Sequence, residues 1–292
     1  MAQLRAYKDN GVILFDTNLI SYGLIKSGYM VYLQSWTRRL LRSAQLDPNN
    51  GANYTPVVAS GNYDAGDNLW GFTVYNSISP VTFITGSGCL VGTQVSGNAM
   101  TFFYTNASVN TKFYCFDLMA NNIAGSPYLK TYDTSGRITF NSLQPPLNVV
   151  GSYQAPGPPA VDRFGRYPNV YNGGYLNRRR SAYNYPGVDS IIDIPLSAIE
   201  YAVFLPWSRT AQCIDTEPAS PSSGPITVYG SSEGAYGRYG GISFIMGATA
   251  GTSQITPGGN QYTVPASWTN LPLDRMPIAL LINTSSYPFP YN

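Results

Sequence analysis

Apolar residues occur along this chain in short runs that end at Gly, Asn, Ser or Pro. Short runs rich in β-branched and aromatic residues are typical of β-strands, and the 3.6-residue period of an amphipathic helix is largely missing. Runs spaced like the strands of a sandwich occupy residues 81–85, 100–104 and 112–116. Further runs predict a second β unit at residues 201–205, 226–229, 242–246 and 278–282. The pattern therefore predicts an all-β fold of sandwich or jelly-roll-like modules.

One segment, residues 36–42, is compatible with two kinds of secondary structure. Ser35 could cap a helix that begins at Trp36. The segment is short, however, and a strand is equally compatible with its length.

A proline- and tyrosine-rich stretch separates the two β-rich halves, from about residue 144 to residue 186. Proline lacks a backbone donor and restricts the residue before it, so no strand can run far through this stretch. Its tyrosines favour an extended arm lying on a neighbouring subunit over a free linker. We therefore expect an N-terminal β module (1–150), an extended arm or linker (151–190) and a C-terminal β module (191–292).

The composition is poor in charge. Charged residues make up 11% of the chain and the formal net charge is +2, against roughly 25% charged residues in an ordinary soluble domain. Nucleic acids and acidic membranes require a concentrated basic field, so neither is an expected partner. No segment approaches the length of a membrane span, and the first residues lack the pattern of a signal peptide. A neutral surface of Ser, Thr, Asn, Gln and Tyr suits close packing against other protein chains.

One residue type that many catalytic sites require is absent. The chain has no histidine, which excludes Ser-His-Asp and Cys-His catalysis and His-ligated metal sites. Two carboxylates could still cleave a glycan, but no acidic residue stands in a recognisable motif. Residues 64–68 lack the ligand spacing of a calcium loop and predict a turn. We expect no enzyme activity, no cofactor and no metal.

The three cysteines are Cys89, Cys115 and Cys213, and none has metal-ligand spacing. An odd number cannot close a disulfide framework. Cys89 and Cys115 lie in apolar runs, so we expect buried free thiols and assembly in a reducing compartment.

Tyrosines beside small polar residues are the candidate binding residues. Rigid rings beside Gly, Ser and Asn also characterise antibody paratopes, although subunit interfaces use the same composition. A Gly/Ser-rich stretch at residues 230–241 is predicted to be a loop. The candidate receptor or partner contacts are Tyr175 and Arg179 in the arm, with Tyr229, Tyr236 and Tyr239 in or beside the loop.

One hairpin motif is present twice in the sequence. Residues 7–17 recur, shifted by 125, as residues 132–142: a Tyr, three residues, a Gly, alternating Ile and Phe, then Asp or Asn and Thr or Ser. Asn10-Gly11 and Ser135-Gly136 supply the positive φ of a tight turn. The repeat predicts two β-hairpins, each with its Ile and Phe on one face.

Residues 4–17 and 129–142 resemble a hairpin that recurs in small tail-tip and baseplate proteins of tailed bacteriophages. In that family a Pro-Leu-x-Val-Val-Gly strand follows the second copy, and residues 146–151 of this chain match it. The resemblance covers residues 1–30 and 80–151. It implies a virion structural protein of a tail tip, baseplate or tail fibre, assembled in the host cytoplasm and acting in tail assembly and host attachment.

The resemblance also implies partners: other phage tail proteins, further copies of this chain in a homo-oligomer, expected to be a trimer, and a host cell-surface receptor. The alternatives are a lectin-like receptor-binding protein and, less favoured, a polysaccharide depolymerase.

Overall fold

The computed structural model describes residues 5–7, 9–16, 19–37, 39–41, 54–56, 66–157, 163, 167–168, 190–215, 226–256, 267–269 and 271–292. These residues form strands and loops with no α-helix, so the predicted all-β class is confirmed. The strands are β1 (Arg5–Tyr7), β2 (Ile13–Asp16), β3 (Tyr22–Tyr29), β4 (Val31–Thr37), β5 (Arg39–Leu41), β6 (Tyr54–Pro56), β7 (Gly66–Tyr75), β8 (Val81–Thr85), β9 (Cys89–Ser96), β10 (Ala99–Thr105), β11 (Lys112–Leu118), β12 (Lys130–Tyr132), β13 (Ile138–Asn141), β14 (Gly151–Gln154), β15 (Tyr167–Pro168), β16 (Ser190–Phe204), β17 (Thr210–Asp215), β18 (Ile226–Thr256), β19 (Ser267–Thr269) and β20 (Ile278–Asn283). A short 3₁₀-helix, η2 (Thr284–Ser286), follows β20.

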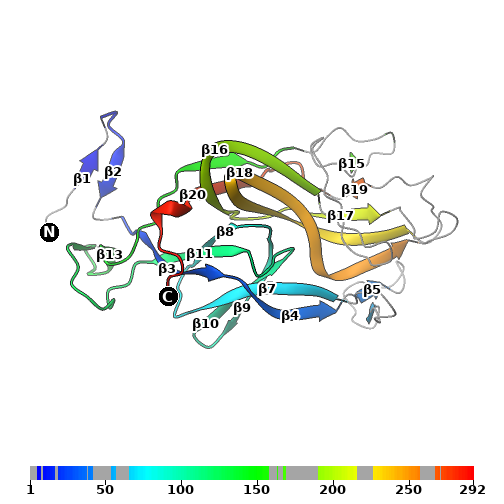
Figure 1. The fold of residues 1–292 in the computed structure, drawn as a ribbon, viewed down its shortest axis with the longest axis horizontal. Helices are drawn as coiled ribbons and strands as arrows, with labels where there is room; N and C mark the ends of the chain where they lie inside the picture. Colours follow the sequence, from blue (N-terminus) through cyan, green and yellow to red (C-terminus); the bar gives the residue numbers. More distant parts are fainter. Residues whose placement is uncertain are drawn as a thin grey trace.

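The strands form two large sheets and two small ribbons. The larger sheet has twelve strands, including β3, β8, β11, β16, β18 and β20, and the smaller has the order β4-β7-β10-β9. Two further sheets consist only of β1-β2 and β12-β13. Figure 1 shows β16 and β18 curling together into an arch beside the four-stranded sheet. Every run predicted as a strand coincides with an observed strand, except that β16 ends at Phe204, one residue before the end of the run at 201–205.

Strands β8 and β11 lie at the centre of the molecule and are covered on both faces. Ile84 and Phe113 pack with Phe72 of the four-stranded sheet in one core cluster. The alternate residues Phe83 and Tyr114 belong to a second cluster on the opposite face. Successive side chains of a strand point to opposite faces, so a strand covered twice must be apolar throughout. Both strands largely meet this requirement: Phe83, Ile84 and residues 113–116 are apolar, and the buried hydroxyls of Thr82 and Thr85 are hydrogen-bonded.

The two halves of the chain share a sheet and a core. Ile84 of β8 pairs with Val203 of β16, and Leu24 lies in one core cluster with Ala202 and Ile282. Strand β14, which falls in the expected arm, pairs along β20. Position 150 is therefore not a boundary between two cores. The composition near it resembles that of a linker, but β20 offers a pairing edge that local sequence does not reveal.

The ambiguous segment at residues 36–42 contains strand and no helix in its described part. Trp36 pairs with Asp67 of β7, and β5 follows at Arg39–Leu41. Pairing with β7 gives these backbone groups the hydrogen bonds that a helix would otherwise provide.

The Gly/Ser-rich stretch at residues 230–241 is strand rather than the predicted loop. It lies inside β18, a single strand of 31 residues. Strand β17 pairs with it as far as Ser232, and β16 pairs with it from Tyr239 onward. A Cβ at Gly237 would collide with the carbonyl oxygen of Tyr201. This glycine therefore allows the close approach of two strands instead of making a turn.

The repeated motif at residues 7–17 and 132–142 forms two hairpins, as predicted. Tyr7 pairs with Ile13 in the first and Tyr132 with Ile138 in the second. Each ribbon has a register shift directly before its tyrosine. Gly11 and Gly136 have φ values of 77° and 76°, so the same left-handed turn residue closes both ribbons.

Candidate functional site

The five predicted contact residues lie in different environments. Tyr236 is half-buried and packs against the core cluster between the sheets. Tyr239, three positions further along β18, is 69% exposed. Tyr229 of β18 pairs with Cys213 of β17, and its side chain is not among those that the structure describes. Tyr175 and Arg179 lie outside the described residues. Tyr236 thus supports the core, while the Tyr239 side chain is largely exposed.

A cleft of about 490 Å³ opens between the two large sheets. Ile78, Leu90 and Trp207 line it and are exposed, with Trp207 at 42%. Tyr104 and Thr82 line it from buried positions. Burial raises the pKa of the Tyr104 phenol far above its ordinary value, so this hydroxyl stays neutral. Aromatic and apolar walls with a few hydroxyl groups suit an uncharged ligand. Nothing in the local sequence predicted this cleft, because its walls come from distant strands.

A buried ion pair lies beneath the cleft. Arg209 Nε donates to Glu233 Oε2 at 2.8 Å and Arg209 Nη2 to Glu233 Oε1 at 2.8 Å, and both side chains are 0% exposed. Burial raises the pKa of Glu233, and the charge of Arg209 counteracts that shift. Arg209 Nη2 also lies 3.5 Å from the carbonyl oxygen of Pro156. The pair is a structural tie, and its carboxylate is held by arginine rather than offered to a ligand.

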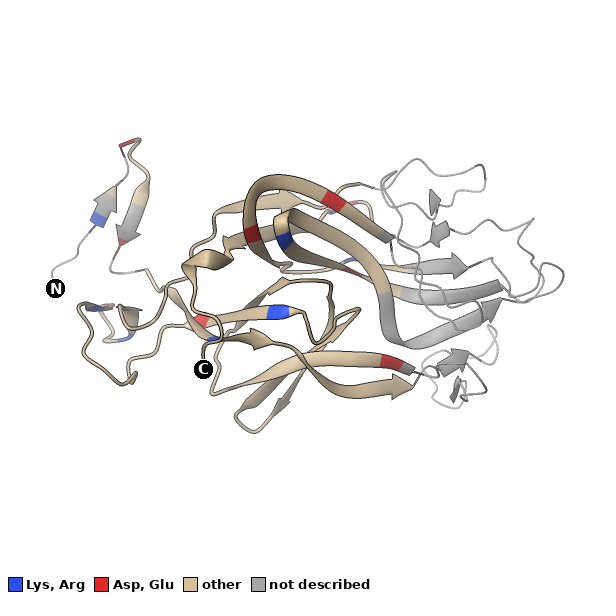
Figure 2. Ribbon diagram, viewed as in Figure 1, with Lys and Arg blue, Asp and Glu red and all other residues tan. Residues whose placement is uncertain are grey.

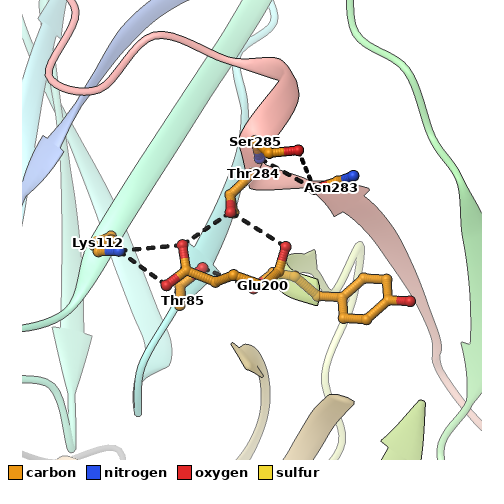
Figure 3. Close-up of polar contacts among 7 residues, drawn as sticks. Thr85, Lys112, Glu200, Asn283, Thr284 and Ser285 are labelled. Atoms are coloured by element: carbon orange, nitrogen blue, oxygen red, sulfur yellow. Dashed lines mark hydrogen bonds and ion pairs between the residues drawn. The ribbon is translucent and has the colours of Figure 1, made fainter. Parts of the chain in front are cut away.

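A second polar network joins the two halves of the chain (Figure 3). Lys112 Nζ lies 2.9 Å from Glu200 Oε2, and the Thr284 hydroxyl donates to Glu200 Oε1 at 2.8 Å. The two charged side chains are 26% and 31% exposed. The ammonium of Lys112 also lies 5.4 Å from the centre of the Phe289 ring. The network links β11, β16 and η2, and its carboxylate is already occupied by a cation and a hydroxyl.

Asp117 is another carboxylate with structural partners. Asp117 accepts the backbone N–H groups of Ile78 and Ser79 at 2.6 and 2.8 Å. Among the described residues, no group of three or more Cys, Asp or Glu side chains could hold a metal ion. The same residues include no helix that is long and apolar enough to cross a membrane. Figure 2 shows the described charges scattered over many strands rather than gathered in one patch.

The hairpin end of the molecule exposes apolar side chains. The first ribbon exposes Tyr7 (54%), Val12 (54%) and Ile13 (44%). On and beside the second ribbon, Tyr128 is 100% and Tyr132 41% exposed. Exposed apolar residues that gather at one end of a molecule indicate an interaction surface.

The second hairpin has its Ile and Phe on one face, as predicted, but that face is not the buried one. Ile138 and Phe140 are only half-buried, whereas Thr139 and Asn141, on the opposite face, are fully buried. The reason is hydrogen bonding: Asn141 Nδ2 donates to the Ala120 carbonyl oxygen at 2.8 Å. The polar face of this ribbon therefore attaches it to the body, and the apolar face points away.

A scan against protein-family models, a search of curated proteins and a search of solved structures found no match to this chain.

Proposed function

We propose that this protein is a structural component of a bacteriophage virion, in the tail tip, the baseplate or a tail fibre, where it acts in tail assembly and host attachment. The observation that carries the proposal is the tail-protein hairpin motif, built twice here with the same register, register shift and glycine turn. The two copies agree in both sequence and geometry, which supports a true internal repeat of the motif that carries the resemblance.

The surface of the molecule supports a role in assembly. Its charged content is only 11%, and large apolar side chains are exposed at the hairpin end. Protein interfaces are enriched in aromatic residues and depleted in most charged ones. Such a surface is suited to packing between chains of a particle.

The proposal is tested by locating the protein in purified particles. Antibodies against the chain, visualised with gold, are expected to mark the tail end, and particles made without the protein should have a missing or collapsed tail end. Protein that is made during infection but is absent from washed particles would refute the proposal.

A second candidate function, lectin-like receptor binding, is favoured by the cleft beside Trp207. An exposed indole next to neutral hydroxyl groups can stack on a sugar ring. If the protein is a lectin-like receptor binder, the purified protein should bind host cells. Trp207→Ala or Tyr239→Ala should then weaken binding without changing the oligomeric state. Equal binding by wild type and both variants would remove this candidate.

Polysaccharide cleavage has the least support, since Glu200 and Glu233 are both engaged by cations. Release of reducing sugars from host polysaccharide by the purified chain would overturn that ranking.

A further inference from the structure

The two hairpins are built alike but have different surroundings. The second is attached to the body of the molecule: the Ser21 N–H donates to the Thr139 carbonyl oxygen at 2.9 Å, and Asn141 Nδ2 donates to Ala120. Thr139 and Asn141 are both 0% exposed. One face of this ribbon is therefore covered within the chain, and only its outer face remains available.

The first hairpin projects beyond the large sheets (Figure 1). Among the side chains that the structure describes in it, every one is exposed except that of Asp16. Leu19 and Ile20, which follow it, are 60% and 41% exposed. A two-stranded ribbon alone in water is marginally stable at best and needs further strands or a packing partner. The exposed apolar side chains show where that partner would pack.

The same cross-strand pair faces outward on both ribbons. Tyr7 lies opposite Ile13, and Tyr132 lies opposite Ile138. Residues directly opposite each other in an antiparallel pair share a face. We name Tyr7, Val12 and Ile13 the first patch, and Tyr128, Leu129 and Tyr132 the second patch.

We propose that the first hairpin of one copy pairs edge to edge with the second hairpin of a neighbouring copy, so that the first patch packs beside the second patch on one face of the joined sheet. The two ribbons have the same register and the same register shift, so they can run edge to edge and add strands to each other. Each is a two-stranded sheet in the isolated chain, which leaves edges for such pairing.

Charge and position also favour a second copy as the occupant. The ribbons hold internal ion pairs, Arg5 with Asp16 and Arg137 with Asp133, each at 2.7 Å. These pairs let the ribbons meet through apolar and main-chain contacts without a partner of opposite charge. Both ribbons also lie at the same end of the molecule (Figure 1), so the hairpin ends of several copies can converge.

The proposed contact joins two different surfaces, so each copy offers one of each. Contacts of this head-to-tail kind close into a ring when the rotation between copies allows it. The contact does not depend on whether the ring belongs to a phage tail. The contact can therefore be refuted while the proposed function stands, and the proposed function can be refuted while the contact stands.

The test is the mass of the full chain in solution, measured by sedimentation velocity. Variant A carries Tyr7→Ser and Ile13→Ser, and variant B carries Leu129→Ser and Tyr132→Ser. The wild type is expected to be an oligomer and each variant a monomer. A control with Tyr75→Ser and Val95→Ser changes residues of the four-stranded sheet that are even more exposed, at 63% and 65%, and should keep the wild-type mass.

Mixing the variants tests the direction of the contact. Variant A keeps an intact second patch and variant B an intact first patch, so an equal mixture should form dimers that cannot grow further. A mixture that stays monomeric, with wild type oligomeric, would mean that the first patch does not bind the second patch and would overturn the proposal.

Two other results would also overturn it. One is a wild-type chain that stays monomeric at about 100 µM, a hundred times the Kd of a micromolar contact. The other is an unchanged mass for variant A, which is expected to fold because its hairpin projects from the body. Should variant B fail to fold, the single change Tyr128→Ser replaces it: this side chain of the second patch is 100% exposed, and the variant must also lose the wild-type mass.

Discussion

At the scale of single residues, a close contact between strands explains why a glycine occupies position 237, where the sequence alone suggests a loop. Gly237 faces the Tyr201 carbonyl, whereas a Cβ at Gly92 of β9 would meet no heavy atom within 4 Å. We expect Gly237→Ala to lower the free energy of unfolding by about 1–3 kcal/mol, as overpacked cores do. Gly92→Ala is the matched control and should change it little. Urea unfolding measures both, and equal losses in the two variants would contradict the close contact.

The buried cysteines give a prediction about reactivity and pH. Burial raises the pKa of the Cys115 thiol to about 12, and the thiolate is the reactive form. Because pH 7 and pH 9 both lie well below that pKa, the native thiol should stay unlabelled by alkylating reagents at either pH. In urea its pKa returns to the ordinary range, and labelling should become faster as the pH rises. Mass spectrometry of the Cys115 peptide measures this, and rapid native labelling at pH 9 would contradict the burial.

Predictions for single residues were correct where the neighbouring residues in sequence determine burial, and wrong where distant strands determine it. Cys89 and Cys115 are both buried, as their apolar neighbours predicted. Tyr236 has small polar neighbours typical of a binding loop, yet it packs on the core. Its position depends on which strands flank β18, and that information lies elsewhere in the chain.

At the scale of elements, the Arg209–Glu233 pair holds the start of β17 against β18. Removing one partner leaves the other charge buried and uncompensated, so Glu233→Gln should cost about 3–5 kcal/mol of stability. Arg137→Gln breaks a pair whose arginine is 70% exposed and should change stability far less. Chemical denaturation of both variants checks this. Similar small losses in each would show that the buried pair is not a structural tie.

Short apolar runs predicted the strands well, because a run of β-branched and aromatic residues fits a pleated sheet under most pairings. The same reasoning failed for residues 230–241, where pairing with β16 and β17 outweighs a loop-like composition. The hairpins could be predicted fully, since their turn residues and alternation are local. The cleft and the two polar networks could not, since each joins residues far apart in sequence.

At the scale of the whole molecule, the shared core predicts one cooperative unit among the central strands. A fragment of residues 1–150 would lose Ala202, Ile282 and Tyr287 from the cluster that covers Phe116. We expect the full chain to unfold in one transition in near-ultraviolet circular dichroism, and the fragment to show no sharp transition of its own. A fragment with a cooperative transition would instead support two independent modules.

The central claim is that this chain is a building block of a phage tail that assembles through its hairpin end. A cryo-electron microscopy reconstruction of the intact particle, at a resolution that separates strands, tests it most directly. The claim predicts several copies of this fold around the tail axis, with β1-β2 of each copy against β12-β13 of the next. A tail end without density for this fold, in particles whose protein content has been verified, would contradict it.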